Sequence, residues 1–290
     1  MNKELARDLI SAGVHFGHAA SRWNPKMEPY IFGKRGMIHI INVKETLRGL
    51  LISKKLLATM VSSGKDVVFV GTKRQAQKAV QQAATACGMH YVSERWLGGT
   101  LTNFRTIRTR LTRLDELEAM ESSGRLESES KKQGARLKRE LTKVRTNLDG
   151  VRRMNRLPGV VVVVDAKKEY IALREARKLG IITVAIMDTD SDPDTVDVAI
   201  PANDDSIKAI EILLNELASA VAEGKTMVRS EEASAAGARP VRTRSRRRVL
   251  ATAEGQTVED DAEGDRGVED VPADVPAVKS EAAQPENAIQ

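Results

Sequence analysis

The sequence predicts an α/β fold with three layers, in which helices cover both faces of a parallel sheet. Three short segments, at residues 67–70, 160–164 and 181–187, are apolar at every position or nearly so. A strand without polar alternation must be covered on both faces, which is typical of a parallel sheet. Segments of helical periodicity separate these strands, as the crossover connections of such a sheet require.

The first 64 residues are expected to form two helices, joined by a segment to which no helix or strand is assigned. Apolar residues at helical spacing begin at Leu5 and stop at Gly13, a residue suited to a helix C-terminus. A stretch containing glycine, proline and aromatic residues follows from 15 to 42. Asn42 stands three residues before a glutamate, as in a capping box, and a leucine pattern continues this second helix to Gly64.

From residue 67 onward, strands and helices alternate. The five consecutive valines at 160–164 are the clearest strand signal, and each helix carries its apolar residues along one side. The expected order is a strand at 67–70, a helix at 76–87, a strand at 160–164, a helix at 170–179, strands at 181–187 and 198–200, and a helix at 204–221.

One segment, at 106–155, interrupts this alternation and predicts an antiparallel coiled-coil hairpin. Its second half has apolar residues at steps of four and three from Leu137 to Val151, and its first half carries a similar pattern from Ile107 to Leu117. A Ser-Ser-Gly turn separates the halves. Residues 103–157 contain 15 Lys/Arg and 8 Asp/Glu, so most of the excess positive charge is expected on a protruding arm.

The predicted domains are a discontinuous α/β domain at 1–105 and 156–228, the hairpin at 106–155, and a disordered low-complexity tail at 229–290. The last 60 residues lack periodicity and are too poor in large apolar side chains to offset chain ordering. An arginine cluster between 239 and 248 precedes an acidic block. That cluster is interpreted either as a nucleic-acid arm or, preferably, as part of a solvated, self-neutralising tail.

Composition narrows the class of protein. The 290 residues carry a net charge of +6, while residues 1–230, with 38 Lys/Arg and 27 Asp/Glu, carry +11. No apolar run is long enough for a membrane span, and no apolar leader follows Met1. The single cysteine, Cys87, excludes an internal disulfide. A reducing cytoplasm and a polyanionic partner are therefore expected.

Two motifs at predicted strand ends are candidate ligand sites. The segment VVFVGTKR at 67–74 could present backbone N–H groups to a phosphate, but it lacks both glycine-rich nucleotide signatures, and a plain turn is preferred. Aspartates occupy every second position from Asp188 to Asp194. Pro193 and Ala199 exclude an EF-hand, which leaves a weaker magnesium site shared with Asp165 as an alternative.

No catalytic or metal constellation is predicted. His15 and His18 could face one metal ion, yet the chain has only four histidines and one distant cysteine to complete a zinc site, so structural roles are preferred. No nucleophile–histidine–carboxylate pattern emerges, and neither a catalytic residue nor a cofactor is expected. The alternatives kept open are a nucleotide- or sugar-phosphate-binding α/β enzyme and a purely protein-binding adaptor.

Cations alternate with aromatic residues in three segments, at 22–26, 34–35 and 95–96. Lysine and arginine can contact phosphates while tryptophan stacks on a base or sugar, a combination that favours RNA. Trp23 and Trp96 could equally anchor their loops to the core. Together with the basic hairpin, these segments make nucleic acid the favoured partner.

Several longer segments closely resemble the bacterial small-subunit ribosomal protein S-two family. The resemblance extends from about residue 2 to 225 and is marked by LISAGVHFGH at 9–18, WNPKM at 23–27, YIFG at 30–33, HIIN at 39–42, GTK at 71–73, RWLGGTLTNF at 95–104, SDP at 191–193 and IP at 200–201. The chain departs from the family pattern at Ile182, Thr195 and Ala202, which puts any family metal contact at the acidic loop in doubt.

The resemblance implies a flavodoxin-like domain with a helical hairpin, in a ribosome-bound protein that is not an enzyme. It implies binding to small-subunit rRNA and to neighbouring ribosomal proteins, with support of subunit assembly, recruitment of ribosomal protein S-one and translation initiation. No metal or cofactor is assigned, and the expected location is cytoplasmic. The expected RNA contacts are phosphate contacts by Arg22, Lys26, Lys34, Arg35, Lys73, Arg74, Arg95, Arg105, Arg108 and Arg110, with Trp23 as a stacking residue.

Overall fold

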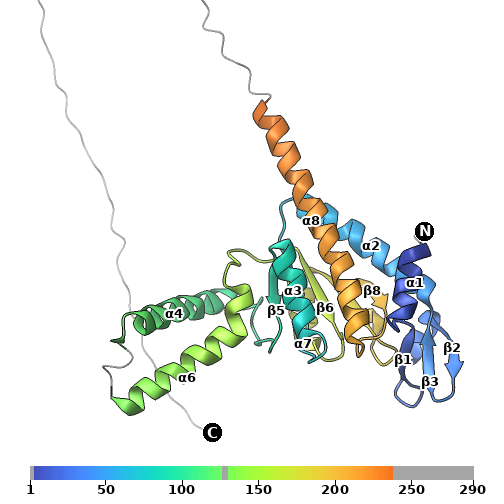
Figure 1. The fold of residues 1–290 in the computed structure, drawn as a ribbon, viewed down its shortest axis with the longest axis horizontal. Coiled ribbons are helices and arrows are strands. Elements are labelled where there is room, and N and C mark those ends of the chain that lie inside the picture. Colours follow the sequence, from blue (N-terminus) through green and yellow to red (C-terminus); the bar gives the residue numbers. More distant parts are fainter. Residues whose placement is uncertain (1–2, 126–129, 238–290) are drawn as a thin grey trace, which may run out of the picture. The chain divides into compact units, whose positions relative to one another are not determined.

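A computed structural model describes residues 3–125 and 130–237 and confirms an α/β fold with a parallel five-stranded sheet (Figure 1). In chain order the sheet runs 2-1-3-4-5, the strand order of flavodoxin-like doubly wound folds. Its spatial order is β5 (His90–Val92), β4 (Val67–Val70), β6 (Val160–Val164), β7 (Ile182–Met187) and β8 (Val198–Pro201), all paired in parallel.

The consecutive valines of β6 serve both faces of the sheet. Val160, Val162 and Val164 point into one hydrophobic cluster, and Val161 and Val163 into another. Successive side chains of a strand point to opposite faces, so an all-valine strand is stable only when both faces are covered. All five valines are fully buried, and this explains why polar alternation is missing from the sequence.

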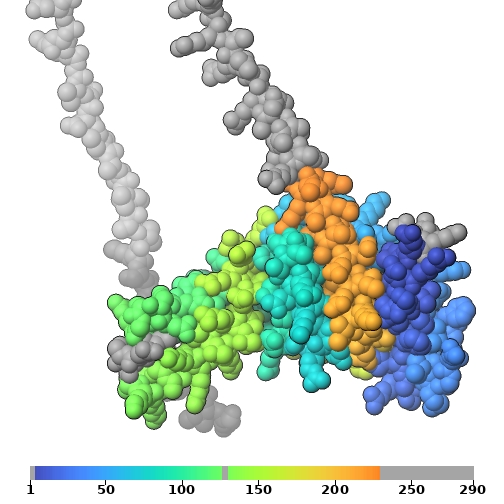
Figure 2. Space-filling model, viewed as in Figure 1, coloured from blue at the N-terminus to red at the C-terminus, as the bar shows by residue number. Residues whose placement is uncertain are grey.

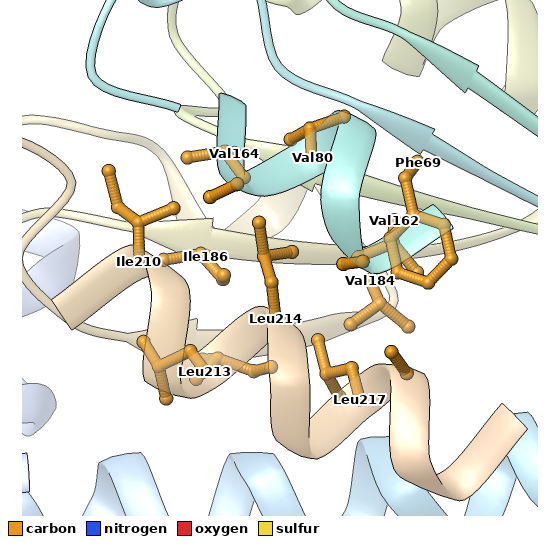
Figure 3. Packing of buried hydrophobic residues seen from close by; sticks show 14 of the residues in the cluster. Phe69, Val80, Val162, Val164, Val184, Ile186, Ile210, Leu213, Leu214 and Leu217 are labelled. Atoms are coloured by element: carbon orange, nitrogen blue, oxygen red, sulfur yellow. The ribbon is translucent and has the colours of Figure 1, made fainter. Parts of the chain in front are cut away.

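Helices cover each face of the sheet. On the first face, Leu214 and Leu217 project toward Val162 and Val184 (Figure 3). The helices of this face are α1 (Lys3–Ser11), α2 (Val43–Ser62), α3 (Gln77–Cys87) and α8 (Ile207–Gly237). The second face is covered by α7 (Tyr170–Lys178) together with the bases of α4 (Phe104–Ser122) and α6 (Lys131–Leu148).

Helix α2 begins where the sequence predicted. The Asn42 side chain accepts a hydrogen bond from the Lys44 backbone N–H, which satisfies one of the free donors of the first turn. The predicted capping box is replaced by this single cap. Helix α8 runs to Gly237, beyond the predicted boundary at residue 228, and the rest of the predicted tail lies outside the described residues.

The segment at 15–42, to which the sequence analysis assigns no helix or strand, contains a three-stranded antiparallel sheet in the order β1-β3-β2. Its strands are only four or five residues long and half exposed, so no run of apolar residues announced them. The strand β5 was also missed because it is short, with only three residues. The added strands are β1 (Phe16–Ala19), β2 (Ile31–Arg35) and β3 (Ile38–Ile41), and the 3-10 turn η1 (Pro25–Tyr30) lies between β1 and β2. Two further 3-10 turns are η2 (Asp149–Val151) and η3 (Pro193–Thr195).

Helices α4 and α6 lie against each other, as the space-filling view shows in green and yellow-green (Figure 2). Ile107 and Leu111 near the start of α4 and Leu148 at the end of α6 join the cluster under the sheet. Leu114, Leu117 and Leu141 are also buried but belong to neither sheet cluster. The predicted apolar seam is therefore present at these positions, while its coiled-coil geometry stays a prediction.

Candidate nucleic-acid interface

The loop between β5 and α4 is held around one buried carboxylate, that of Glu175 on α7. The carboxylate accepts hydrogen bonds from the Trp96 indole N–H at 3.2 Å and from the Gly99 backbone N–H at 2.7 Å. It also accepts from the Leu101 backbone N–H and from both the backbone and the hydroxyl of Thr102. This carboxylate therefore fixes the loop from which α4 starts.

The electrostatics of Glu175 agree with this geometry. Burial alone would raise its pKa, but the backbone hydrogen bonds from Gly99, Thr102 and Leu101 lower the pKa below its usual value. Trp96 is buried, with its indole N–H committed to the carboxylate, so it anchors the loop. Arg95, its neighbour, is exposed. The loop thus presents a cation from a rigid base.

A groove of about 740 Å³ lies between α4, α6 and this loop. Arg136, Arg139 and Lys143 line it from α6, and Arg110 lines it from α4. Glu140 is the acidic residue in the lining, and its Oε1 is 3.8 Å from Nε of Arg113. We call this space the hairpin groove. Its lining therefore holds four cationic side chains and one carboxylate.

Two other cations of this segment, Arg145 on α6 and Arg152 directly after η2, are neutralised internally. The Arg145 guanidinium contacts Glu118 at 3.0 Å and Glu121 at 3.4 Å. Arg152 pairs with Asp115 and with Glu118, the latter at 2.8 Å. Hydrogen bonds from Arg145 and Arg152 outweigh desolvation and lower the pKa of Glu118. By contrast, no described residue forms a salt bridge with a cation of the hairpin groove.

Most of the cations predicted from sequence to contact RNA are exposed and unpaired. Trp23 is half-buried, with its ring centroid 5.0 Å from that of His39. Within residues 3–125 and 130–237, no salt bridge involves the following predicted contacts: Arg22, Lys34, Arg35, Arg74, Arg95, Arg105 and Arg110.

Two exposed predicted contacts already have internal partners. The Lys26 ammonium lies 2.9 Å from an oxygen of Asp192 and 2.6 Å from one of Asp194. Arg108 donates to the Met154 carbonyl and to the Asn155 side chain. A phosphate contact by either residue would require these interactions to be exchanged.

Lys73 is enclosed at the carboxyl edge of the sheet. Its ammonium lies 2.7 Å from Asp204, 2.6 Å from Asp205 and 3.8 Å from Asp165, and its side chain is 15% exposed. Burial opposes its charge, but hydrogen bonds to Asp204 and Asp205 raise the pKa of Lys73. Burial raises the pKa of Asp204 to about 7, against the effect of Lys73. Lys73 therefore serves an internal cluster.

The aspartates at 188–194 do not converge on one cation with Asp165. Asp188 accepts from Nδ1 of His18 at 2.6 Å, and this hydrogen bond raises the pKa of His18 to about 9. Asp190 pairs with Lys167 at 2.9 Å, while Asp192 and Asp194 face η1. Of the described residues, His18, Asp188 and Asp204 do bring ligand-type atoms within 4.8 Å of one another, a grouping the sequence did not predict.

Comparison with known proteins identifies the family. A sequence profile described as ribosomal protein S2 matches residues 9–224. The chain belongs to the ribosomal protein S2 family.

Relatives in this family match over most of their length. The small ribosomal subunit protein uS2 of Rhodopirellula baltica is 55% identical over 240 residues, which cover 83% of this chain and 92% of the relative. The corresponding protein of Synechocystis is 48% identical over 75% of this chain and 81% of its own length. The protein named uS2c of Rhodomonas salina is 52% identical over 75% of this chain and 89% of its own.

Membership of the S2 family confirms the resemblance noted in the sequence and assigns the chain to the small ribosomal subunit. The family is one of structural ribosomal proteins, not of enzymes, and association with the subunit's rRNA and proteins follows from it. Across the described residues, no helix has both the length and the apolar character needed to cross a membrane.

In the turn after β4, a candidate nucleotide site in the sequence, both donors of Thr72 are committed to a buried carboxylate in this S2-family chain. The Thr72 backbone N–H donates to Glu169 at 3.0 Å, and the Thr72 hydroxyl donates to the same oxygen. Glu169 is 3% exposed, and burial raises its pKa. Carboxylates thus occupy the switch point between β4 and β6, where flavodoxin-like folds bind ligands.

The three groove cations of α6 were not singled out from the sequence of this S2-family protein. Arg136, Arg139 and Lys143 recur at steps of three and four, the spacing of one helix face. That spacing is readable in the sequence, but net charge alone does not distinguish it from the rest of the hairpin. The role of Glu175 had no such signal, because its partners are more than 70 residues away in the chain.

Proposed function

We propose that this chain is a structural constituent of the small ribosomal subunit that binds the phosphate backbone of small-subunit rRNA. The observation that carries the proposal is the set of exposed predicted cations that have no partner among the residues that the structure describes. Exposed, unpaired arginine and lysine side chains can release counterions from RNA without first giving up an ion pair. These cations are Arg22, Lys34, Arg35, Arg74, Arg95, Arg105 and Arg110.

The proposal extends to the subunit's other components. Trp23, half-buried beside His39, would stack on a base or sugar with its exposed part. By family resemblance, the chain would contact neighbouring ribosomal proteins, support subunit assembly, and help recruit ribosomal protein S-one in translation initiation. Its location would be cytoplasmic and ribosome-bound. Lys26, Lys73 and Arg108 would join the RNA contacts only by exchanging their present partners.

The test is the salt dependence of binding to a small-subunit rRNA transcript. With six to ten phosphate contacts, affinity should fall by roughly 10³–10⁵ between 50 and 200 mM salt. Replacing Arg22, Arg35 and Arg95 by glutamine should reduce that slope and weaken co-sedimentation with small subunits. A flat salt response of the unaltered chain would contradict the proposal.

A further inference from the structure

The hairpin groove carries a more specific inference, which rests on the proposed function. We propose that this groove binds a short run of consecutive phosphates of a single RNA strand, held between α6 on one side and Arg110 of α4 on the other. The groove is lined by Arg110, Arg136, Arg139 and Lys143, together with Leu97, Gly98 and Gly99 of the Glu175-anchored loop.

Charge complementarity favours a polyanion as the occupant. Four cations face the groove with one carboxylate among them, and that carboxylate has Arg113 beside it. Like charges gathered in one concave space raise each other's energy, and an anion in the groove removes this cost. Arg145 and Arg152, which do not line the groove, are by contrast paired with acidic residues of the hairpin segment itself.

The spacing on α6 suits a phosphate backbone. Arg136, Arg139 and Lys143 stand at steps of three and four and so share one face of the helix. Seven residues at 1.5 Å per residue separate the outer two by about 10 Å along the helix. One strand of a stacked DNA duplex advances by about 3.4 Å per nucleotide, and on that scale this reach corresponds to about three nucleotide steps. Arginine also suits bidentate contact with phosphate oxygens.

The loop end of the groove is both open and rigid. An added Cβ on Gly98 would have no atom within 4 Å, so a strand can approach the backbone there. Gly99 has a φ of 89°, a conformation that glycine adopts without strain, and its N–H is held by Glu175. The wall is therefore preorganised, which lowers the ordering cost of binding.

The experiment compares two charge-matched triple variants of the full chain. In the groove variant, Arg136, Arg139 and Lys143 become glutamine. In the control, Lys55, Arg177 and Lys178 become glutamine, and all three are exposed residues of the α/β part outside the groove. Each protein is titrated with a small-subunit rRNA transcript at several salt concentrations, and thermal melting by circular dichroism checks the fold.

Loss of three single-strand contacts should make the salt slope shallower by about 2 and weaken binding roughly 100-fold at 0.1 M salt. Arg110→Gln alone should weaken it about fivefold. The control should stay within about threefold of the unaltered chain, because none of its three residues lines the groove. This pattern, with unchanged melting, supports the groove.

Three results would overturn it. Equal weakening by both triple variants would show that overall charge, not the groove, governs binding. If the groove variant binds rRNA as tightly as the unaltered chain, the groove does not bind RNA, while the proposed function stays intact. If the groove variant binds rRNA normally but fails to co-sediment with small subunits, the groove would instead bind an acidic surface of a neighbouring protein. Absence of salt-dependent binding by the unaltered chain would instead refute the proposed function itself.

Discussion

Replacing Glu175 by alanine should destabilise the protein by removing the centre of a buried hydrogen-bond network. The carboxylate is 8% exposed and accepts five hydrogen bonds, from Trp96, Gly99, Leu101 and twice from Thr102. Alanine leaves these donors without an acceptor, and a buried donor left unsatisfied costs about 1–3 kcal/mol. With the Trp96 and Leu101 donors both buried, we expect a loss of about 3–5 kcal/mol in the free energy of unfolding.

The assay is equilibrium urea unfolding, with Glu223→Ala as the matched control. Glu223 is exposed on α8, so its removal should change stability by less than about 0.5 kcal/mol. A loss of less than about 1 kcal/mol for Glu175→Ala would show that the loop does not depend on this carboxylate. In a Trp23→Phe background, where Trp96 is the remaining tryptophan, intrinsic fluorescence reports whether the loop itself has loosened.

The pH dependence of the same variant gives a second check. The folded-state pKa of Glu175 lies below its unfolded value, so its stabilising contribution is present above the unfolded pKa of about 4.3. That contribution is lost as the pH falls through the lower, folded-state pKa. The stability difference between the unaltered chain and Glu175→Ala should therefore narrow in acid. A difference that stays constant from about pH 7 to about pH 3 would contradict the assignment.

Three further substitutions test other parts of the structure. Phe69→Ala should lower the free energy of unfolding in urea by about 3–5 kcal/mol, because loss of the fully buried ring leaves a cavity in the core against the sheet. A loss below about 1 kcal/mol would show that this core is loosely packed. The pKa of His18, about 9, exceeds its unfolded value of about 6.5, so the stability that the Asp188 partner provides is complete below about pH 6.5 and is lost as the pH rises through about 9. His18→Gln should remove this pH dependence of stability. A midpoint near 6.5 in an NMR titration of His18 would contradict the raised pKa. Gly150→Ala should lower the melting temperature, since its Cβ would overlap the Tyr91 carbonyl, and an unchanged melting temperature would count against that contact.

The sequence predicted those parts of the fold that rest on local pattern. Residues 67–70 and 160–164 match β4 and β6 at both ends, because fully buried strands carry an uninterrupted apolar signal. Asn42 marked the start of α2 for an equally local reason, the cap of its first turn. The sheet at 16–41 was missed, because its short strands expose residues such as Phe32 and so lack alternation.

The candidate site was predictable in kind but not in arrangement. Net charge identified the basic hairpin, and Arg105 and Arg110, in the first two turns of α4, are both exposed. Sequence could not show that Lys73 is enclosed by Asp204 and Asp205, which lie more than 130 residues away in the chain. Such long-range pairings are set by sheet topology, and they decide which cations remain available.

The pairing of β4 with β6 has a consequence for biosynthesis. About 90 residues, including α4 and α6, separate the two strands in the chain, while β5 follows β4 closely. At about 5–20 residues per second, the ribosome needs roughly 5–18 seconds between completing one strand and beginning the other. Throughout that interval, the edge of β4 that will pair with β6 has no partner strand. An unpaired strand edge promotes aggregation, against which chaperones act.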